Sequence, residues 1–182
     1  DIAEVESRTL VSKLEGKVEH LPHYIRTDLR DIDALRAAVE EAATTLGGIR
    51  VLVNNAARDD RHELETVEPD YWDENQAVNL RHHFFAAQAV APHMRSGGGG
   101  AIISFSSIAF LLNMGELPAY ATAKAGIVGL TKSLAGKLGP DNIRVNAILP
   151  GMVLTERQKR LWIDEDAVAD GIARQCLKRS LI

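Results

Sequence analysis

The sequence predicts a single α/β domain over residues 1–182, built on a doubly wound parallel sheet with helices on both faces. Three short, almost wholly apolar segments, 49–53, 101–105 and 143–149, read as strands covered on both sides. Stretches with helical spacing alternate with them, which is the order of an α/β fold. With 182 residues, of which 46% are hydrophobic, the chain can form one core and is too short for two ordinary domains.

The predicted helices share apolar residues at a spacing of three to four. They span residues 2–14, 35–46, 69–95 and 118–138. Gly16 is a plausible stop for the first helix, and a short extended run over 23–29 precedes the second. The glycines at 97–100 indicate a surface turn, since they lack the lysine and the following helix of a phosphate-binding loop.

Composition narrows the class of function. The net charge of −4 gives no attraction for nucleic acid or an anionic membrane, and no run approaches the roughly 20 apolar residues of a membrane helix. The only cysteine, Cys176, fits a reducing compartment such as the cytoplasm. Neither the His82–His83 pair nor the His20–His23 pair has a carboxylate or cysteine that would complete a metal site, so we predict no metal.

Polar residues stand just past the predicted strands. Asn54, Ser106 and Pro150 each follow one of the three apolar segments. Parallel sheets bind ligands at the carboxyl ends of their strands, so we expect these positions to share one crevice. Asn54 could also be only a turn former, and a serine beside a strand end could only satisfy the backbone.

Tyr120 and Lys124 stand four residues apart at the start of the helix predicted over 118–138, so both leave the same helix face. A phenol has a pKa near 10, and using it as a base at neutral pH requires lowering that pKa by about 3 units, or about 4 kcal/mol. One cation about 4 Å away, at an effective dielectric of about 20, supplies about that much. Ser107, thirteen residues before Tyr120, could face it across the crevice and donate to a substrate oxygen.

These residues together resemble the classical short-chain dehydrogenases and reductases, which have a Rossmann-like fold. The matching motifs, in family order, are NNAA from Asn54, VNL around Asn79, the serines ending at Ser107, YxxxK from Tyr120 and PGxxxT from Pro150. The resemblance implies a catalytic tetrad of Asn79, Ser107, Tyr120 and Lys124. Tyr120 would exchange the proton, Ser107 would position the reacting oxygen, Lys124 would hold the nicotinamide ribose, and Asn79 would anchor a relay water. Asn79 could instead mark only a local helix distortion.

The resemblance also implies a nicotinamide cofactor. Asp1 falls where the family places an acidic residue on the ribose hydroxyls, which favours NAD over NADP, and Asp28 with Leu29 falls beside the adenine. The family's first strand, its glycine-rich turn and its last strand are expected outside this chain. The full set of cofactor-binding positions implied is Asp1, Asp28, Leu29, Asn55, Ala56, Tyr120, Lys124, Pro150, Gly151, Val153 and Thr155.

A closer resemblance, carried by NNAARDDRH from Asn54, YWDE from Tyr71 and VNLRH from Val78, is to the bacterial aldose 1-dehydrogenases of the D-xylose type. It implies oxidation of a sugar's anomeric carbon by NAD, giving an aldonolactone, and a homotetramer built on the helices at 69–95 and 118–138. The substrate positions are then Asp59, Arg61, His62, Ser107 and Tyr120, although the charged loop at 59–62 could simply be solvated.

Two other functions stay open at this point. The same tetrad serves NAD(P)-dependent reductases of other substrates, such as 3-oxoacyl thioesters or cyclic ketones. A non-catalytic scaffold with a dehydrogenase-like fold is the third reading, because the phosphate-binding turn is not in this sequence.

Overall fold

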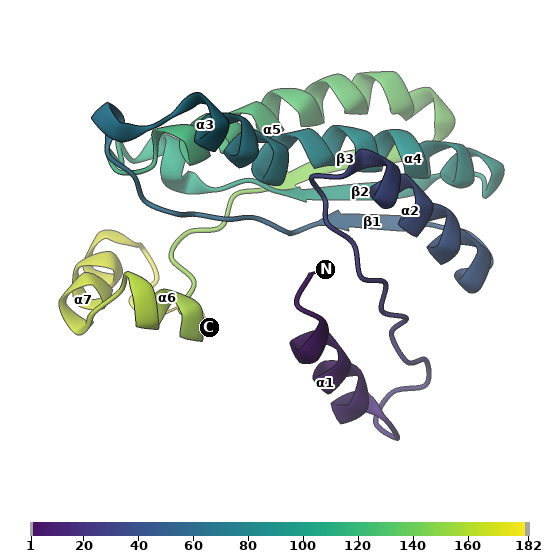
Figure 1. The fold of residues 1–182 in the computed structure, drawn as a ribbon, viewed down its shortest axis with the longest axis horizontal. Helices are drawn as coiled ribbons and strands as arrows, with labels where there is room; N and C mark the ends of the chain where they lie inside the picture. Colours follow the sequence, from purple (N-terminus) through teal and green to yellow (C-terminus); the bar gives the residue numbers. More distant parts are fainter. Residues whose placement is uncertain (1, 181–182) are drawn as a thin grey trace. The chain divides into compact units, whose positions relative to one another are not determined.

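The computed structural model describes residues 2–180, which divide into two compact units, Asp1–Ile148 and Leu149–Ile182 (Figure 1). The first unit holds a parallel sheet with flanking helices, which confirms the predicted fold class. The second unit holds two short helices. The assignment of residues 1–182 to one domain stays a prediction.

The sheet of the described residues has three parallel strands in the order β1-β2-β3. They are β1 Val51–Asn54, β2 Gly100–Phe105 and β3 Ile143–Ile148, within two residues of the predicted segments. In the register, Asn54 lies beside Ser104, and Ser104 lies beside Ala147. All three strands therefore end at one edge of the sheet.

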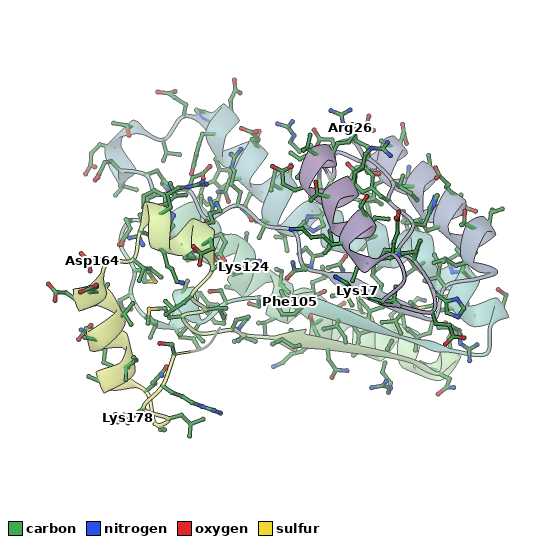
Figure 2. All side chains as sticks on the ribbon, turned by 90° about the horizontal axis from the view of Figure 1, so that it is seen from below. Lys17, Arg26, Phe105, Lys124, Asp164 and Lys178 are labelled. Carbon is green, nitrogen blue, oxygen red and sulfur yellow. The ribbon has the colours of Figure 1, made fainter. Side chains whose placement is uncertain are left out.

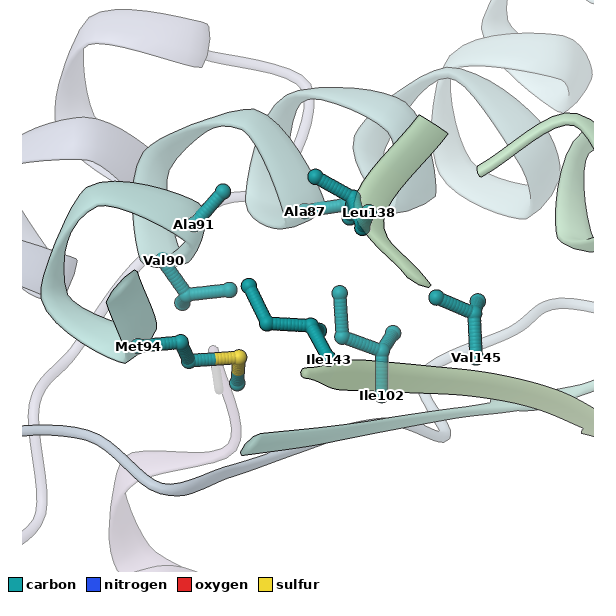
Figure 3. Packing of buried hydrophobic residues seen from close by; sticks show 8 residues of the cluster. All are labelled: Ala87, Val90, Ala91, Met94, Ile102, Leu138, Ile143 and Val145. Carbon is teal, nitrogen blue, oxygen red and sulfur yellow. The ribbon is translucent and has the colours of Figure 1, made fainter. Parts of the chain in front are cut away.

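Two long helices, α4 (His82–Ser96) and α5 (Pro118–Leu138), lie on one side of this sheet, and α2 (Ile32–Leu46) packs against α4 (Figure 1). The core between helices and sheet consists of small and branched apolar side chains around Met94, which is fully buried (Figure 3). Its members are Ala87, Val90, Ala91, Met94, Ile102, Leu138, Ile143 and Val145. Close packing of this layer holds the C-terminal part of α5, around Leu138, against β2 and β3.

The outer face of β1 is more exposed than its sequence predicts. Val51 and Val53 are 57% and 53% exposed, whereas Leu52 between them packs against the core. The expectation that every strand is covered on both faces is therefore wrong for β1, and also for β3, where Arg144 and Asn146 are exposed. The helix that contacts β1, α4, reaches only the face on which Leu52 lies.

Local chemistry explains the ends of α2. The Asp31 carboxylate accepts hydrogen bonds from the backbone N–H groups of Asp33 and Ala34, and Gly47 ends the helix with a left-handed φ of 70°. The first helix, α1 (Glu4–Leu14), ends two residues before Gly16, as predicted. The run at 23–29 forms no strand in the described structure.

The helix predicted over 69–95 is three segments. They are α3 (Pro69–Gln76), a π-helical turn η2 (Ala77–Arg81) and α4. The π turn holds Asn79, the residue at which the sequence suggested a helix distortion. Such turns lie within α-helices and are frequent at functional sites.

The remaining elements were not predicted. In the second unit, Thr155 caps α6 (Glu156–Leu161) and Asp164 caps α7 (Glu165–Arg174). Both are ordinary capping signals, a Thr or Asp just before acidic first-turn residues. Three short 3-10 turns complete the structure: η1 Leu64–Thr66, η3 Ile108–Leu111 and η4 Gly139–Asp141. Among residues 2–180, no helix has the length and apolar character to cross a bilayer.

Candidate functional site

The two serines after β2 have different tasks. Ser106 is buried, and its hydroxyl donates to the backbone carbonyl of Lys124 at 2.6 Å. The Ser107 oxygen accepts from the N–H of Ala109 at 3.1 Å and caps η3, while no described residue accepts its hydroxyl proton. Ser106 thus ties the strand to α5, and Ser107 keeps a donor for a ligand. This division favours Ser107 over Ser106 for the substrate oxygen.

Lys124 and Tyr120 are neighbours on the first turns of α5. The Lys124 ammonium lies 5.3 Å from the centre of the Tyr120 ring. It donates to the carbonyl oxygen of Phe105 at 2.8 Å, and Lys124 and Phe105 are both labelled in Figure 2. The side chain of Lys124 is almost wholly buried, at 1% exposure. A fixed cation beside a half-buried phenol is the arrangement that the spacing of these two residues predicted.

Burial lowers the pKa of Lys124 to about 8, while the nearby Asp59 carboxylate acts in the raising direction. The lysine is therefore charged at neutral pH and close to its titration point. Three ammonium protons serve one described acceptor, Phe105, so two remain for a ligand. Strong perturbation by burial at a strand end is typical of a functional lysine.

Asn79 grips the backbone of the loop that follows β1. Its Oδ1 accepts from the N–H of Arg58 at 2.8 Å, and its Nδ2 donates to the carbonyl of Arg58 at 3.0 Å and to Oδ1 of Asn75 at 3.1 Å. Both asparagines are completely buried. The side chain of Asn79 therefore fixes the loop beside the site, with both amide hydrogens engaged.

A chain of alternating charges continues from this loop. Arg58 pairs with Asp60 at 2.7 Å and with Glu74 at 3.2 Å, and Glu74 also pairs with Arg30 at 2.7 Å. The Arg30 guanidinium in turn donates to both carboxylate oxygens of Asp28. The Arg30 guanidinium lowers the pKa of Asp28, and Arg58 with Arg30 lowers that of Glu74. The carboxylate of Asp28 is thus engaged by Arg30, a partner that the sequence did not reveal.

The predicted substrate loop lies beside these groups. Arg61 pairs with Glu116, and Asp59 lies near enough to Lys124 to act on its charge. The backbone N–H of His62 donates to the carbonyl of Glu116 at 3.1 Å. These contacts tie the loop to the turn before α5, so it is a structured element rather than a freely solvated run of charges.

The other predicted positions are distributed as follows. Asp1 lies outside the described residues. Asn55 and Ala56 are exposed just past β1, and Leu29 is half-buried beside Asp28. Pro150, Gly151, Val153 and Thr155 belong to the second unit, where Thr155 caps α6.

Two hollows on the protein surface are lined by residues outside the predicted tetrad. One lies beside residues 142–146 and another beside residues 46–50, both away from Tyr120. No group of three or more His, Cys, Asp or Glu side chains within residues 2–180 is placed to hold a metal. The candidate site therefore rests on its side-chain contacts.

His82 and His83 are buried titratable groups that the sequence reading set aside. Their ring centres are 4.3 Å apart, and none of their four ring nitrogens has a hydrogen-bond partner among the described residues. Burial lowers the pKa of His82 to about 4 and, with help from the charge of His82, that of His83 to about 2. Both are neutral in the folded protein.

This burial predicts a loss of stability in acid. As the pH falls below 6.5, the ordinary pKa of histidine, these two side chains become protonated in the unfolded chain. In the folded protein His82 stays neutral until the pH approaches its pKa of about 4. Between pH 6.5 and 5 this costs about 2 kcal/mol for each histidine. Denaturant unfolding at pH 7 and pH 5 measures the loss. We expect the double variant H82N/H83N to lose little stability between pH 7 and pH 5. The control H20N, at an exposed histidine, should lose as much stability as the wild type. A double variant that loses as much as the wild type would refute this account.

The chain is similar in sequence to known dehydrogenases. Residues 1–166 match the family model described as short chain dehydrogenase. A probable galactose dehydrogenase of Rhizobium meliloti (strain 1021) is 64% identical over 182 residues, which is 100% of this chain and 71% of that protein. The D-xylose 1-dehydrogenase of Caulobacter vibrioides is 47% identical, with the same coverage of both chains.

Solved structures give the same picture. A 7α-hydroxysteroid dehydrogenase in complex with NADH and 7-oxo glycochenodeoxycholic acid superposes with a TM-score of 0.92 at 27% identity, covering 100% of this chain and 70% of that one. A gluconate 5-dehydrogenase from Burkholderia cenocepacia J2315, in complex with NADP and tartrate, has a TM-score of 0.85 at 31% identity, covering 96% and 68%.

Proposed function

This chain belongs to the short-chain dehydrogenase family of oxidoreductases acting on CH–OH groups, and we propose that it oxidises the anomeric carbon of an aldose with NAD, giving an aldonolactone. The observation that carries the proposal is the joint occurrence of two things. One is the buried Lys124 beside Tyr120 at the end of β2. The other is 64% and 47% identity, over the whole chain, to proteins named galactose and D-xylose 1-dehydrogenase.

The tetrad residues have matching tasks in this reaction. Tyr120 removes the proton of the anomeric hydroxyl, Ser107 donates to the same oxygen, and Lys124 keeps the phenol acidic. The two unused ammonium protons of Lys124 suit the hydroxyls of a nicotinamide ribose. When bound, the nicotinamide ring accepts the hydride from the sugar carbon. Asn79 holds the loop backbone at Arg58, and we propose that it also anchors a relay water beside the site.

The choice of sugar is proposed to lie with the loop after β1. Asp59 and Arg61 offer an acceptor and donors beside Lys124 and Glu116. A site that hydrogen-bonds several hydroxyls discriminates strongly against analogues that lack them. We propose that these two residues, together with Ser107 and Tyr120, form the sugar site. His62, the fifth residue implied by the resemblance, has protein partners at both ring nitrogens, and we propose that it supports the site without contacting the sugar.

The cofactor-binding positions implied by the family motifs are proposed for NAD rather than NADP. They are Asp1, Asp28, Leu29, Asn55, Ala56, Tyr120, Lys124, Pro150, Gly151, Val153 and Thr155. A carboxylate at position 1 would repel a 2′-phosphate, which supports NAD. Among structural neighbours, one holds NADH and another NADP, so the preference is a matter for measurement.

We also propose a cytoplasmic homotetramer. The helices α4 and α5 resemble the family's assembly helices, and the lone Cys176 suits a reducing compartment. Light scattering at micromolar concentration should give four times the subunit mass, whereas a monomer would contradict the assembly.

The function is tested by absorbance of reduced nicotinamide with NAD or NADP and a panel of aldoses, hydroxysteroids and acyl thioesters. Reduction of NAD with a pentose or hexose is the expected result. Activity confined to steroids or thioesters would overturn the sugar assignment and leave the dehydrogenase chemistry. A protein that binds no dinucleotide at all would favour the scaffold reading.

A further inference from the structure

The peptide group of Ala119, directly before Tyr120, is held by side chains from two other parts of the chain. Its N–H donates to Nε2 of His62 at 3.4 Å, and its carbonyl accepts from Nε2 of Gln76 at 2.9 Å. Ala119 has no exposed surface. His62 comes from the loop after β1, and Gln76 is the last residue of α3.

This N–H is one that a helix cannot satisfy for itself. The first N–H groups of an α-helix have no partner within the helix, and a Ser, Thr, Asp or Asn at the N-cap usually supplies one. The N-cap of α5 is Leu117, whose side chain makes no such bond. His62 therefore takes the place of the missing cap at a buried position, where an unpaired N–H is costly.

The contacts of His62 define which nitrogen carries its proton. Because Nε2 accepts, the proton of the neutral ring lies on Nδ1, which faces the Tyr71 hydroxyl at 3.0 Å and the Asp60 carbonyl oxygen at 3.3 Å. The Tyr71 hydroxyl donates a hydrogen bond to the carbonyl of Asp60 at 3.2 Å. Both ring nitrogens are thus engaged by the protein. The ring of His62 is oriented by Tyr71 and is not free to bind a sugar hydroxyl.

Building on the proposed function, we infer that His62 and Gln76 are positioning residues for Tyr120. They act through the N–H and the carbonyl at Ala119. Tyr71 helps to fix the tautomer of His62. A peptide held at both its donor and its acceptor cannot rotate or slide. The residue attached to it then keeps its place relative to Ser107 and Lys124. Misplacement of a reacting group by about 1 Å costs up to about 10²-fold in rate.

The kinetic test compares variants that remove a contact with one that keeps it. We expect H62L and Q76M to lower kcat by about 10- to 100-fold with KM for NAD and for the aldose within about threefold. H62Q, whose side-chain oxygen can still accept from the Ala119 N–H, should stay within about threefold of the wild-type kcat. Q88M, at an exposed glutamine of α4, is the matched control and should be unaffected.

Two results would overturn the inference. Equal losses in H62Q and H62L would mean that the acceptor at this position is irrelevant. A rise in KM for the sugar with kcat unchanged would mean that His62 contacts the substrate itself. If H62L does not fold, as judged by circular dichroism, then Q76M and Y71F carry the same test.

A second readout needs no substrate and separates this inference from the sugar assignment. The ionisation midpoint of Tyr120 can be followed by ultraviolet difference absorbance against Y120F. Loss of positioning in H62L or Q76M should move that midpoint to higher pH, because the phenol leaves the field of Lys124. An inactive wild type on every aldose would refute the proposed function only, whereas an unmoved midpoint would refute the positioning role.

Discussion

Replacing Tyr120 with phenylalanine lowers kcat by about 10³-fold, because the phenol oxygen is the group that takes the proton from the anomeric hydroxyl. The substitution removes one oxygen and keeps the ring against which the Lys124 ammonium lies at 5.3 Å. Cofactor affinity should therefore change little. Steady-state kinetics with the best aldose of the panel, together with fluorescence titration of NAD, measures both quantities.

The control for this experiment is Y24F, which removes a phenol oxygen from a tyrosine whose ring lies against Arg8. It should keep the wild-type rate. Unchanged turnover in Y120F would refute the mechanism outright. A parallel loss in Y24F would point to general damage rather than chemistry.

Replacing Lys124 with methionine lowers kcat by a similar factor of about 10³ and at the same time stabilises the fold. Bringing the pKa of this lysine from 10.5 to about 8 costs the folded protein about 3 kcal/mol at pH 7. The lost hydrogen bond to Phe105 returns about 1 kcal/mol of that. We expect a net gain of about 2 kcal/mol in the free energy of unfolding.

The pH dependence of stability separates these effects. Between about pH 8 and 10.5 the unfolded chain holds a proton on Lys124 that the folded protein has released, so wild-type stability rises with pH across this window. K124M should lack this rise, and K132M, at an exposed lysine of the same helix, should keep it. A K124M protein that is both inactive and less stable at pH 7 would contradict the account of burial.

Much of the framework was predictable because it depends on local signals. The strands were predicted from their apolar runs and α5 from the helical spacing of its apolar residues. The Tyr120–Lys124 neighbourhood follows from helical spacing alone. The division of labour between Ser106 and Ser107 did not follow, because the partner of Ser106 is the carbonyl of Lys124, 18 residues away.

Contacts between distant segments explain what the sequence left out. The pairing of Glu74 with Arg30 and Arg58 joins positions 44 and 16 residues apart, and charge signs alone do not select partners at such separations. The hold of His62 on Ala119 spans 57 residues. A histidine in a charged loop gives no sign of which backbone group its nitrogen will accept from.

The π turn at Ala77–Arg81 changes the rotation of α4 about the helix axis relative to α3, compared with a continuous α-helix. Before it, α3 packs against α5; after it, α4 packs against the sheet and α2. Each residue of an α-helix advances the rotation by about 100°, so a single deletion at Val78 would turn one half against the other by that angle. In this stretch the chain length is therefore constrained as well as the identity of Asn79.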